Sequence, residues 1–424
     1  MNDEQLKGKA TDIDGEIQKK VGEAVGSGVR PEYNLDFTDP AINRNPWPYM
    51  DEVRAIGPAV WNEPSQSWLV TGYKESRAIL MNEADFRPAG ELYEEIFGGP
   101  TVLGADNPRH LQLRSVWDKY LRRDAMQNYV DLINEIADKR LGAVLEQVRA
   151  GEVVDFVPHL RKIPTELTAR MIGVPVEDCE DFIRWGHCMV EQFHLYNAPN
   201  AEAAEQMRKD AVDATQALHD YSGRVLEERR RTGNSDDLLG VLATTAIPMT
   251  EQEKRSYITI FIEGAQDTST KLITSALGSL ALHPDQKKAL VADRALIPQA
   301  LEEVMRWHGP VSLDIRIARH ANVQIGGIHI PEGDHVSPAL GAANRDPSRW
   351  SDPHAFNIFR PAQPHLGFGF GIHICMGINV ARILGEIVLN KVLDAIPDYR
   401  LAEDGLDCGR SFIIRGPVRL PLTL

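Results

Sequence analysis

Cysteine is scarce in this sequence, and long apolar runs are missing from it. The 424 residues hold four cysteines, which stand too far apart for a disulfide scaffold and fit a reducing compartment. No stretch of about 18 consecutive apolar residues is present, so no membrane span is expected. The N-terminal residues 1–7 also lack the charged-then-apolar layout of a signal peptide. We therefore expect a cytoplasmic protein that does not enter a membrane.

Positive charge is in deficit as well. The chain carries 61 Asp and Glu against 46 Lys and Arg, which gives a formal net charge of -15 at pH 7. A surface of this sign disfavours nucleic acid as a partner. Hydrophobic residues make up 43% of the chain, enough to build a large buried core.

The order of local patterns predicts a mostly helical protein with small strand regions. Helical spacing dominates residues 105–310, and strand patterns occur around turns in residues 58–73 and 315–339. Phe412–Ile414 and Val418–Leu420 are predicted to pair as a C-terminal hairpin. Residues 1–30 are polar and contain glycine, so we expect them to form a flexible arm.

One cysteine lies in an unusual segment, residues 368–377, which reads Phe-Gly-Phe-Gly-Ile-His-Ile-Cys-Met-Gly. Glycines at 369, 371 and 377 allow backbone N–H groups to approach the sulfur of Cys375 without side-chain clash. Residues 378–388 have helical apolar spacing, which predicts that Cys375 precedes a helix N-terminus. The helix dipole lowers the pKa of a thiol in that position. For Cys179, Cys188 and Cys408 we expect the ordinary role of small buried residues.

This segment resembles the haem-binding loop of the cytochrome P-450 family of haem-thiolate monooxygenases. The resemblance implies that Cys375 is the axial ligand of the iron of haem b, to which a thiolate donates electron density. It also implies the family's fold, which is mostly α with small β-sheets and has a helical lobe and a smaller β-rich lobe. Residues 31–424 would form this single domain, and the absence of an N-terminal anchor points to the soluble, bacterial-type branch.

A second motif lies in a long predicted helix. Thr250 and Glu253 form a capping box at its start, and Pro284 marks its end. Midway lies Gly264-Ala265-Gln266-Asp267-Thr268-Ser269, which resembles the family's distal helix. The resemblance implies that Asp267 and Thr268 are catalytic, because they would deliver protons to dioxygen. Ala265 stands where the family more often has glycine.

Further residues are implied by the same resemblance. The cofactor-binding set includes cations for the haem propionates, one residue of the distal helix and residues of the ligand loop, which is segment 368–377. Its members are His110, Arg114, Ala265, Arg316, Phe368, Gly369, His373 and Gly377. A buried network of Glu303, Arg306 and Arg360 would support the ligand loop from behind. Asp314 shares a strand face with Arg316, and it would orient that arginine or touch a propionate or the substrate.

The expected substrate is a small apolar or aromatic molecule, modified by hydroxylation or oxidative O-demethylation. Its predicted contacts are Phe97, Val102, Leu313 and Ile413, although core packing explains the same residues. Electrons are expected from a separate ferredoxin and its reductase, docked on the basic segment 109–123, and the protein is expected to be a monomer. A peroxide-driven peroxygenase and a non-enzymatic haem protein are the alternatives, and both are disfavoured by the acid–alcohol pair.

Overall fold

The computed structural model describes residues 30–191, 198, 200–233, 236–402, 406–408 and 411–424. The arm predicted for residues 1–30 therefore lies outside the described residues, except for Arg30 at its end. The α-helices are α2 (Pro40–Arg44), α3 (Trp47–Ile56), α4 (Tyr73–Met81), α5 (Gly90–Phe97), α6 (Arg109–Ser115), α7 (Arg123–Met126), α8 (Val130–Arg149), α9 (Val157–Ile172), α10 (Cys179–Glu191), α11 (Ala201–Thr232), α12 (Leu238–Thr244), α13 (Glu251–Leu282), α14 (Pro284–Ala292), α15 (Ile297–His308), α16 (Leu340–Ala343) and α17 (Ile378–Ala395).

Short strands form three sheets among the described residues. They are β1 (Val60–Asn62), β2 (Ser67–Val70), β3 (Phe86–Pro88), β4 (Val154–Asp155), β5 (Arg316–Ala318), β6 (Gln324–Ile325), β7 (Ile328–His329), β8 (His335–Pro338), β9 (Arg400–Leu401) and β10 (Pro421–Thr423). The largest sheet has the order β1-β2-β8-β5-β3, in which only β2 and β8 run parallel. The prediction of a mostly helical chain with small sheets is confirmed.

The predicted C-terminal hairpin is wrong. Residues 412–414 form no strand, and Ile414 makes only an isolated bridge to Val311. The last strand is β10, which pairs with β4 and β9 instead. Gly416 and Pro417 looked like a hairpin turn, but the N–H groups of Gly416 and Val418 donate to the carbonyls of Cys408 and Asp407, outside the predicted strand pair.

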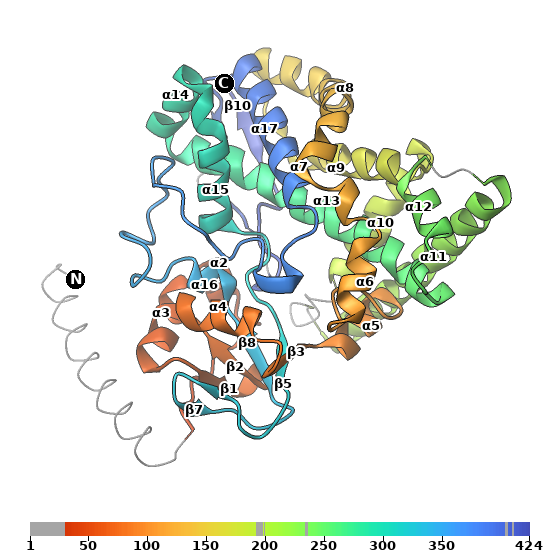
Figure 1. The fold of residues 1–424 in the computed structure, drawn as a ribbon. Coiled ribbons are helices and arrows are strands. Elements are labelled where there is room, and N and C mark those ends of the chain that lie inside the picture. The colour runs from red at the N-terminus through yellow and green to blue at the C-terminus, as the bar shows by residue number, and fades with distance from the viewer. Residues whose placement is uncertain (1–29, 192–197, 199, 234–235, 403–405, 409–410) are drawn as a thin grey trace, which may run out of the picture.

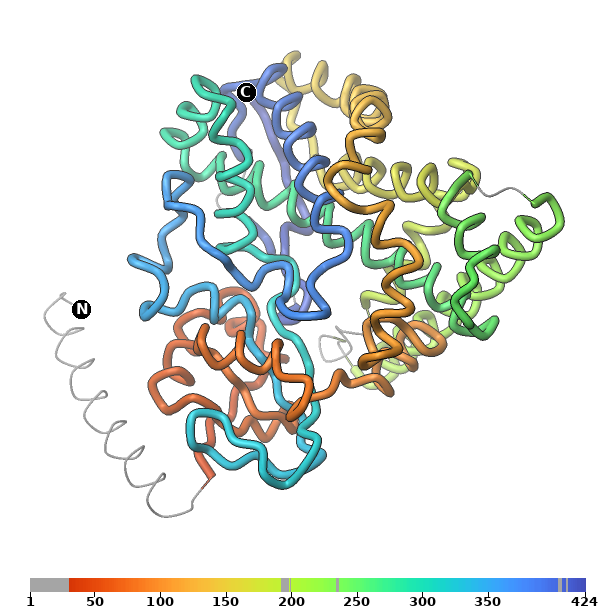
Figure 2. Tube along the Cα trace, in the orientation of Figure 1, coloured from red at the N-terminus to blue at the C-terminus, as the bar shows by residue number. Residues whose placement is uncertain are grey.

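Long helices enclose the main core. Helix α13 begins with the predicted capping box, in which the side chains of Thr250 and Glu253 each bond the other's backbone N–H. Helix α13 packs against α9, α15 and α17, and α17 also packs against α15. Figure 2 shows α15 in teal beside α17 in blue.

The loop that carries Cys375 lies where the helical part meets the sheet-bearing part. Its short 3₁₀ helix η7 (Gly371–His373) contacts α4, whereas the helix that follows, α17, contacts α13. Figure 1 shows this blue loop at the centre of the molecule, with α15 and α17 above it and the large sheet below. The loop and the helix that follows it therefore contact both the sheet-bearing part and the helical part of the fold.

Candidate haem-thiolate site

The ligand loop is a tight backbone turn that two glycines make possible. The backbone N–H of Cys375 donates to the Phe368 carbonyl across the loop at 2.9 Å. Gly369 and Gly371 have φ angles of 70° and 73°, in the region that favours glycine. A Cβ on Gly371 would also collide with the Leu80 carbonyl of α4. The shape of the loop therefore favours glycine at both positions.

The residues around Cys375 together oppose the ionisation of its thiol. Burial raises the pKa of the Cys375 thiol, and this outweighs the backbone N–H of Gly377 and the positive charges of Arg114 and Arg382. The sequence argument predicted a lowered pKa from the helix N-terminus, so its net direction is wrong. The backbone N–H and the cations act in the expected direction, but they are weaker than the loss of water. A metal ion bound to the sulfur would supply the missing positive charge.

Arg114 holds the ligand loop. Its Nη1 donates to the carbonyls of Ile372 at 3.1 Å and Ile374 at 2.6 Å, and its Nε lies 3.4 Å from an Asp118 carboxylate oxygen. The resemblance implied a propionate partner for this guanidinium. In the structure two loop carbonyls and one carboxylate already accept from it, so it clamps the residues on both sides of His373.

Two histidines stack beside this clamp. The rings of His110 on α6 and His373 on η7 have centroids 4.4 Å apart. Burial lowers the pKa of His110 to about 4 and that of His373 to about 3, and neighbouring arginines add to both effects. Both rings are therefore neutral at pH 7. The Nε2 of His373 is buried and has no hydrogen-bond partner among the described residues.

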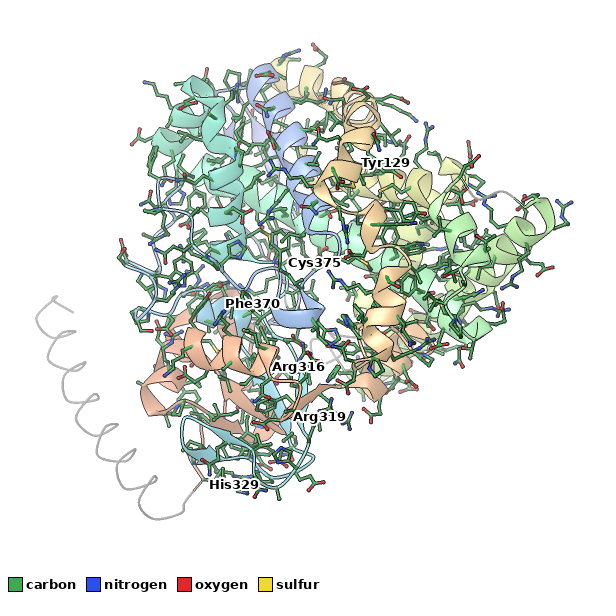
Figure 3. The ribbon with its side chains drawn as sticks, viewed as in Figure 1. Tyr129, Arg316, Arg319, His329, Phe370 and Cys375 are labelled. Carbon is green, nitrogen blue, oxygen red and sulfur yellow. The ribbon has the colours of Figure 1, made fainter. Side chains whose placement is uncertain are left out.

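Arg316 and Asp314 form an ion pair below the loop. Arg316 Nη1 lies 2.8 Å from the Asp314 carboxylate, so Asp314 orients this arginine, one of the alternatives that the sequence left open. Figure 3 shows Arg316 on the strand side of the loop that carries Phe370 and Cys375. Tyr93 of α5 lies near the pair. Burial raises the pKa of its phenol, and the Asp314 charge adds to this. Sequence reasoning missed Tyr93, which has no local signal.

The distal helix α13 presents two different faces at the motif. On one face the Thr268 hydroxyl donates to the Gly264 carbonyl at 2.6 Å, and a Cβ on Gly264 would meet no atom within 4 Å. On another face Asp267 pairs with Lys271 one turn later, and Arg161 of α9 lies 4.0 Å away. The bond back to a carbonyl is the expected behaviour of a threonine inside a helix. Lys271 was missed, although its spacing of four residues from Asp267 is a visible signal.

These residues fit a haem. Among the described residues no cluster of three or more His, Cys, Asp and Glu could hold a metal ion, so a single cysteine suits a metal that brings its other ligands in a macrocycle. The unpartnered His373 Nε2 suits a propionate oxygen. Gly264 leaves open space on α13, and the half-buried Ala265 follows it.

The expected network behind the loop is assembled. Arg306 donates to both carboxylate oxygens of Glu303 at 2.7 Å, and Arg360 Nε lies 3.3 Å from the same carboxylate. Arg306 also bonds the backbone carbonyls of Asn344 and Pro353. The triad therefore ties α15 to the long irregular segment before the ligand loop.

A neighbouring glutamate was missed by the sequence analysis. Glu302 accepts from Arg382 of α17 at 2.8 Å, and it lies 3.2 Å from His365 Nε2. Burial alone would raise the pKa of Glu302, but these two partners outweigh it and lower that pKa to about 2. Arg382 also lies over the Phe368 ring. Glu302 therefore connects α15 with both ends of the loop.

The four predicted substrate contacts fall into two groups. Leu313 and Ile413 pack in one apolar cluster, and the Ser312 N–H donates to the Ile413 carbonyl at 2.8 Å. Phe97 and Val102 belong to the large helical core, where the Phe97 carbonyl bonds His219 of α11 at 2.9 Å. The structure therefore places the four residues in two separate apolar clusters, and their contact with substrate stays a prediction.

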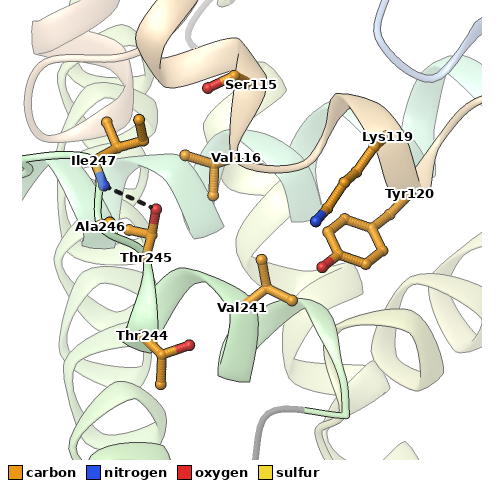
Figure 4. A pocket seen from close by; sticks show the side chains of 9 residues that line it. All are labelled: Ser115, Val116, Lys119, Tyr120, Val241, Thr244, Thr245, Ala246 and Ile247. Carbon is orange, nitrogen blue, oxygen red and sulfur yellow. Dashed lines mark hydrogen bonds between the residues drawn. The ribbon is translucent and has the colours of Figure 1, made fainter.

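The basic segment 109–123 is partly neutralised by neighbouring acids. Arg109 pairs with Glu253 at 2.6 Å, and Arg122 pairs with Asp118 at 3.3 Å. A surface depression of about 470 Å³ lies beside this segment, between it and α12 (Figure 4). It is lined by Ser115, Val116, Lys119, Tyr120, Val241, Thr244, Thr245, Ala246 and Ile247. None of the proposed site residues lines it, so it is separate from the ligand loop.

Among the described residues, no helix is both long and apolar enough to cross a membrane.

Known proteins that are similar to this chain fall in one family. Residues 57–395 match the family model described as Cytochrome P450. The 6-deoxyerythronolide B hydroxylase of Saccharopolyspora erythraea is 30% identical over 384 residues, which cover 84% of this chain and 90% of that protein. A Biotin biosynthesis cytochrome P450 of Bacillus subtilis is 28% identical over 391 residues, or 90% of this chain and 96% of that protein.

Solved structures give the same result. The chain is similar to CYP109E1 from Bacillus megaterium in complex with testosterone, with a TM-score of 0.80 and 27% identity over 91% of this chain and 99% of that chain. It is equally similar in TM-score, 0.80, to P450BioI in complex with an acyl carrier protein that carries hexadec-9Z-enoic acid, at 26% identity and the same coverage. The chain therefore belongs to the cytochrome P450 family, and it is a haem-containing monooxygenase of the bacterial type.

Proposed function

We propose that this monooxygenase inserts one oxygen atom into a small apolar or aromatic substrate, by hydroxylation or oxidative O-demethylation. The apolar character of Phe97, Val102, Leu313 and Ile413 supports this substrate class. Relatives act on varied molecules, and one is named a Vitamin D(3) 25-hydroxylase. The proposal places the whole reaction in one domain, residues 31–424, of a monomeric cytoplasmic protein.

The proposed cofactor is haem b, with Cys375 as the axial ligand. When bound, haem supplies the iron at which dioxygen is reduced and its bond is cleaved. The protein side of the site is proposed to be held by the loop residues Phe368, Gly369 and Gly377 around the sulfur and by Ala265 on the distal helix. His110, Arg114, Arg316 and His373 form the polar edge for the propionates, with Arg316 and the unpartnered His373 Nε2 as direct donors.

The observation that carries this proposal is the acid–alcohol pair on α13. Asp267 and Thr268 are adjacent, and their side chains have different partners: a cation for the acid and a backbone carbonyl for the alcohol. The acid and the alcohol are therefore adjacent in the chain, and the hydroxyl lies at the Gly264 carbonyl. A peroxygenase or a ligand-storage protein has no need of such a route, because neither must bring two protons to dioxygen.

Electrons are proposed to come from a separate ferredoxin and its reductase. The described residues hold no cysteine cluster of the kind that binds an iron–sulfur centre, since the four cysteines are all free and scattered. Arg122 and Arg123 are exposed near the ligand loop, and they suit an acidic partner protein.

The test is a spectral screen of small apolar compounds and aryl methyl ethers against the purified holoenzyme. A substrate should shift the haem absorption by displacing water from the iron. The compound that binds most tightly is then incubated with a [2Fe–2S] ferredoxin, its reductase, NADH and isotopically labelled dioxygen. One labelled oxygen atom in the hydroxylated product, or formaldehyde from the ether, is expected. Product formation with hydrogen peroxide but none with NADH would instead favour a peroxygenase.

A further inference from the structure

A carboxyl group that the proposed reaction does not yet use is buried on the distal helix. Glu263 precedes Gly264 on α13, and its residue is only 8% exposed. One carboxyl oxygen lies 3.4 Å from Gln266 Nε2, which in turn bonds the Phe182 carbonyl of α10 at 2.9 Å. Buried glutamates are rare in proteins unless they are paired, and this one has no cation within ion-pair distance among the described residues.

The fold makes room for this carboxyl. Gly186 of α10 lies directly opposite, and a Cβ there would collide with both the Glu263 carboxyl and the Gln266 amide. Gln266 is held from a third element, since Thr165 of α9 donates to its Oε1 at 3.3 Å. The carboxyl is therefore enclosed by three helices at a fixed position.

Charged groups of the proposed proton route lie next to the Glu263 carboxyl. Glu263, Asp267 and Lys271 follow one another at spacings of four residues, so they form a row along one face of α13. From α9, Arg161 reaches toward the row, and its buried Nε has no hydrogen-bond partner among the described residues. The side chain of Arg161 is 30% exposed, so it connects the row to solvent. Helix α10 contributes the backbone at Gly186 and Phe182.

We propose that Glu263 is a second proton-carrying residue of the distal helix and supplies protons to Asp267. The O–H bond of Glu263 breaks and an O–H bond forms on the Asp267 carboxylate, so the negative charge moves one helical turn. Asp267 then loses its attraction for Lys271 and can pass the proton on toward Thr268. A proton from solvent restores Glu263 along the side of Arg161. This inference rests on the proposed role of Asp267 and extends it.

The protonation state of the free site agrees with this role. Burial raises the pKa of Glu263 to about 8, and the charge of Asp267 adds to the effect. Gln266, Lys271 and Arg161 act in the opposite direction but are weaker. Glu263 therefore carries a proton at pH 7 and is close to the operating pH, which suits a proton donor.

The first test measures whether the fold keeps this proton. A carboxyl whose pKa is raised by folding loses stability as pH rises from its unfolded value near 4.5 to about 8. Glu263→Gln is neutral at every pH and keeps the shape of the acid. The thermal midpoint of Glu263→Gln should therefore rise relative to that of the parent holoenzyme between pH 5 and pH 8, because only the parent loses stability over that range. A constant difference would mean that Glu263 is not protonated in the fold, and the proposal would be wrong.

The second test measures proton delivery. NADH oxidation is followed with a [2Fe–2S] ferredoxin and its reductase, in the presence of anisole as the probe compound. Glu263→Gln should slow oxidation by about tenfold, less than the loss expected for an acid in direct contact with the reacting group. Its solvent isotope effect should rise, and the decline of the parent's rate above pH 8 should disappear. Glu251→Gln, an exposed carboxyl change on the same helix, should leave all three quantities as in the parent.

The outcomes separate the two proposals. If Asp267→Asn slows oxidation and Glu263→Gln does not, Asp267 is supplied by another route and only the present inference fails. If neither variant changes the rate, the isotope effect or the pH profile, the proton route on α13 fails as a whole.

Discussion

The imidazole rings of His110 and His373 pack edge to face, with their planes inclined by 60°. One ring belongs to α6 and the other to the ligand loop, two residues before Cys375. Because Arg114 binds the carbonyls on both sides of His373, helix α6 controls the position of the loop through a ring contact and a clamp. The proposed propionate edge and the proposed iron ligand are thus parts of one assembly.

Replacing Cys375 should abolish the thiolate spectrum. The reduced carbon monoxide complex of the parent should absorb at the long-wavelength position of cysteinate-ligated haem, and Cys375→Ser should lose that band because a hydroxyl is not an equivalent donor. The serine variants of Cys179, Cys188 and Cys408 are the matched controls and should keep it. A thiolate band in Cys375→Ser would assign the ligand elsewhere.

Thr268→Ala should bind substrate normally but release more hydrogen peroxide for each NADH consumed. The alanine removes the hydroxyl that lies at the Gly264 carbonyl, so proton delivery loses one of its two proposed groups. Asp267→Asn should mainly slow turnover, by about 100-fold, because the amide cannot carry a proton. Peroxide and NADH are measured in the same reaction. Unchanged coupling in Thr268→Ala would contradict the assignment of the alcohol.

Reversing charge at Arg122 and Arg123 should weaken ferredoxin docking. The double variant Arg122→Glu with Arg123→Glu should raise the ferredoxin concentration for half-maximal turnover and flatten its dependence on salt, because steering by an exposed patch is screened by ions. Arg208→Glu with Lys209→Glu on α11 makes the same charge change on another exposed surface and should have little effect. Equal responses of the two double variants would mean that net charge, and not this patch, determines docking.

Glu302 should stabilise the protein at neutral pH, and this contribution should be lost in acid. Its pKa is lowered to about 2 in the fold, so its contribution is present above an unfolded pKa near 4.5 and is lost as pH falls toward 2. Glu302→Gln should reduce the free energy of unfolding by about 2 kcal/mol at pH 7. Chemical denaturation at several pH values measures this difference, which should shrink steadily below pH 4.5. A difference that is independent of pH would mean that packing, and not charge, is lost.

Arg306→Lys should destabilise the protein although it keeps the charge. The guanidinium makes two parallel bonds to Glu303 and further bonds to three backbone carbonyls, a geometry that an ammonium cannot reproduce. A loss of about 3 kcal/mol is expected, since a buried carboxylate is left poorly paired. Thermal unfolding and the fraction of protein that retains haem are the measurements. Full haem content and an unchanged midpoint would contradict the supporting role of the triad.

Local patterns in the sequence were sufficient for several features. The capping box at Thr250 and Glu253 depends on residues three apart, and the helical spacing after Gly377 depends on a single helix. The glycines at 369 and 371 are required by the backbone of the loop itself. Such features could be predicted because their partners are close in the chain.

Only the tertiary structure decided which distant groups meet. Burial reversed the expected direction of the Cys375 pKa, and Arg114 of α6 binds two carbonyls of the loop. Residues 412–414 and 418–420 form no strand, whereas β10 after them pairs with β4 and β9. The proposed role of Glu263 had no local signal, because the burial that raises its pKa comes from the helices packed against α13. Desolvation and pairing arise from the sum of all neighbours in space, whereas a sequence motif specifies only the neighbours along the chain.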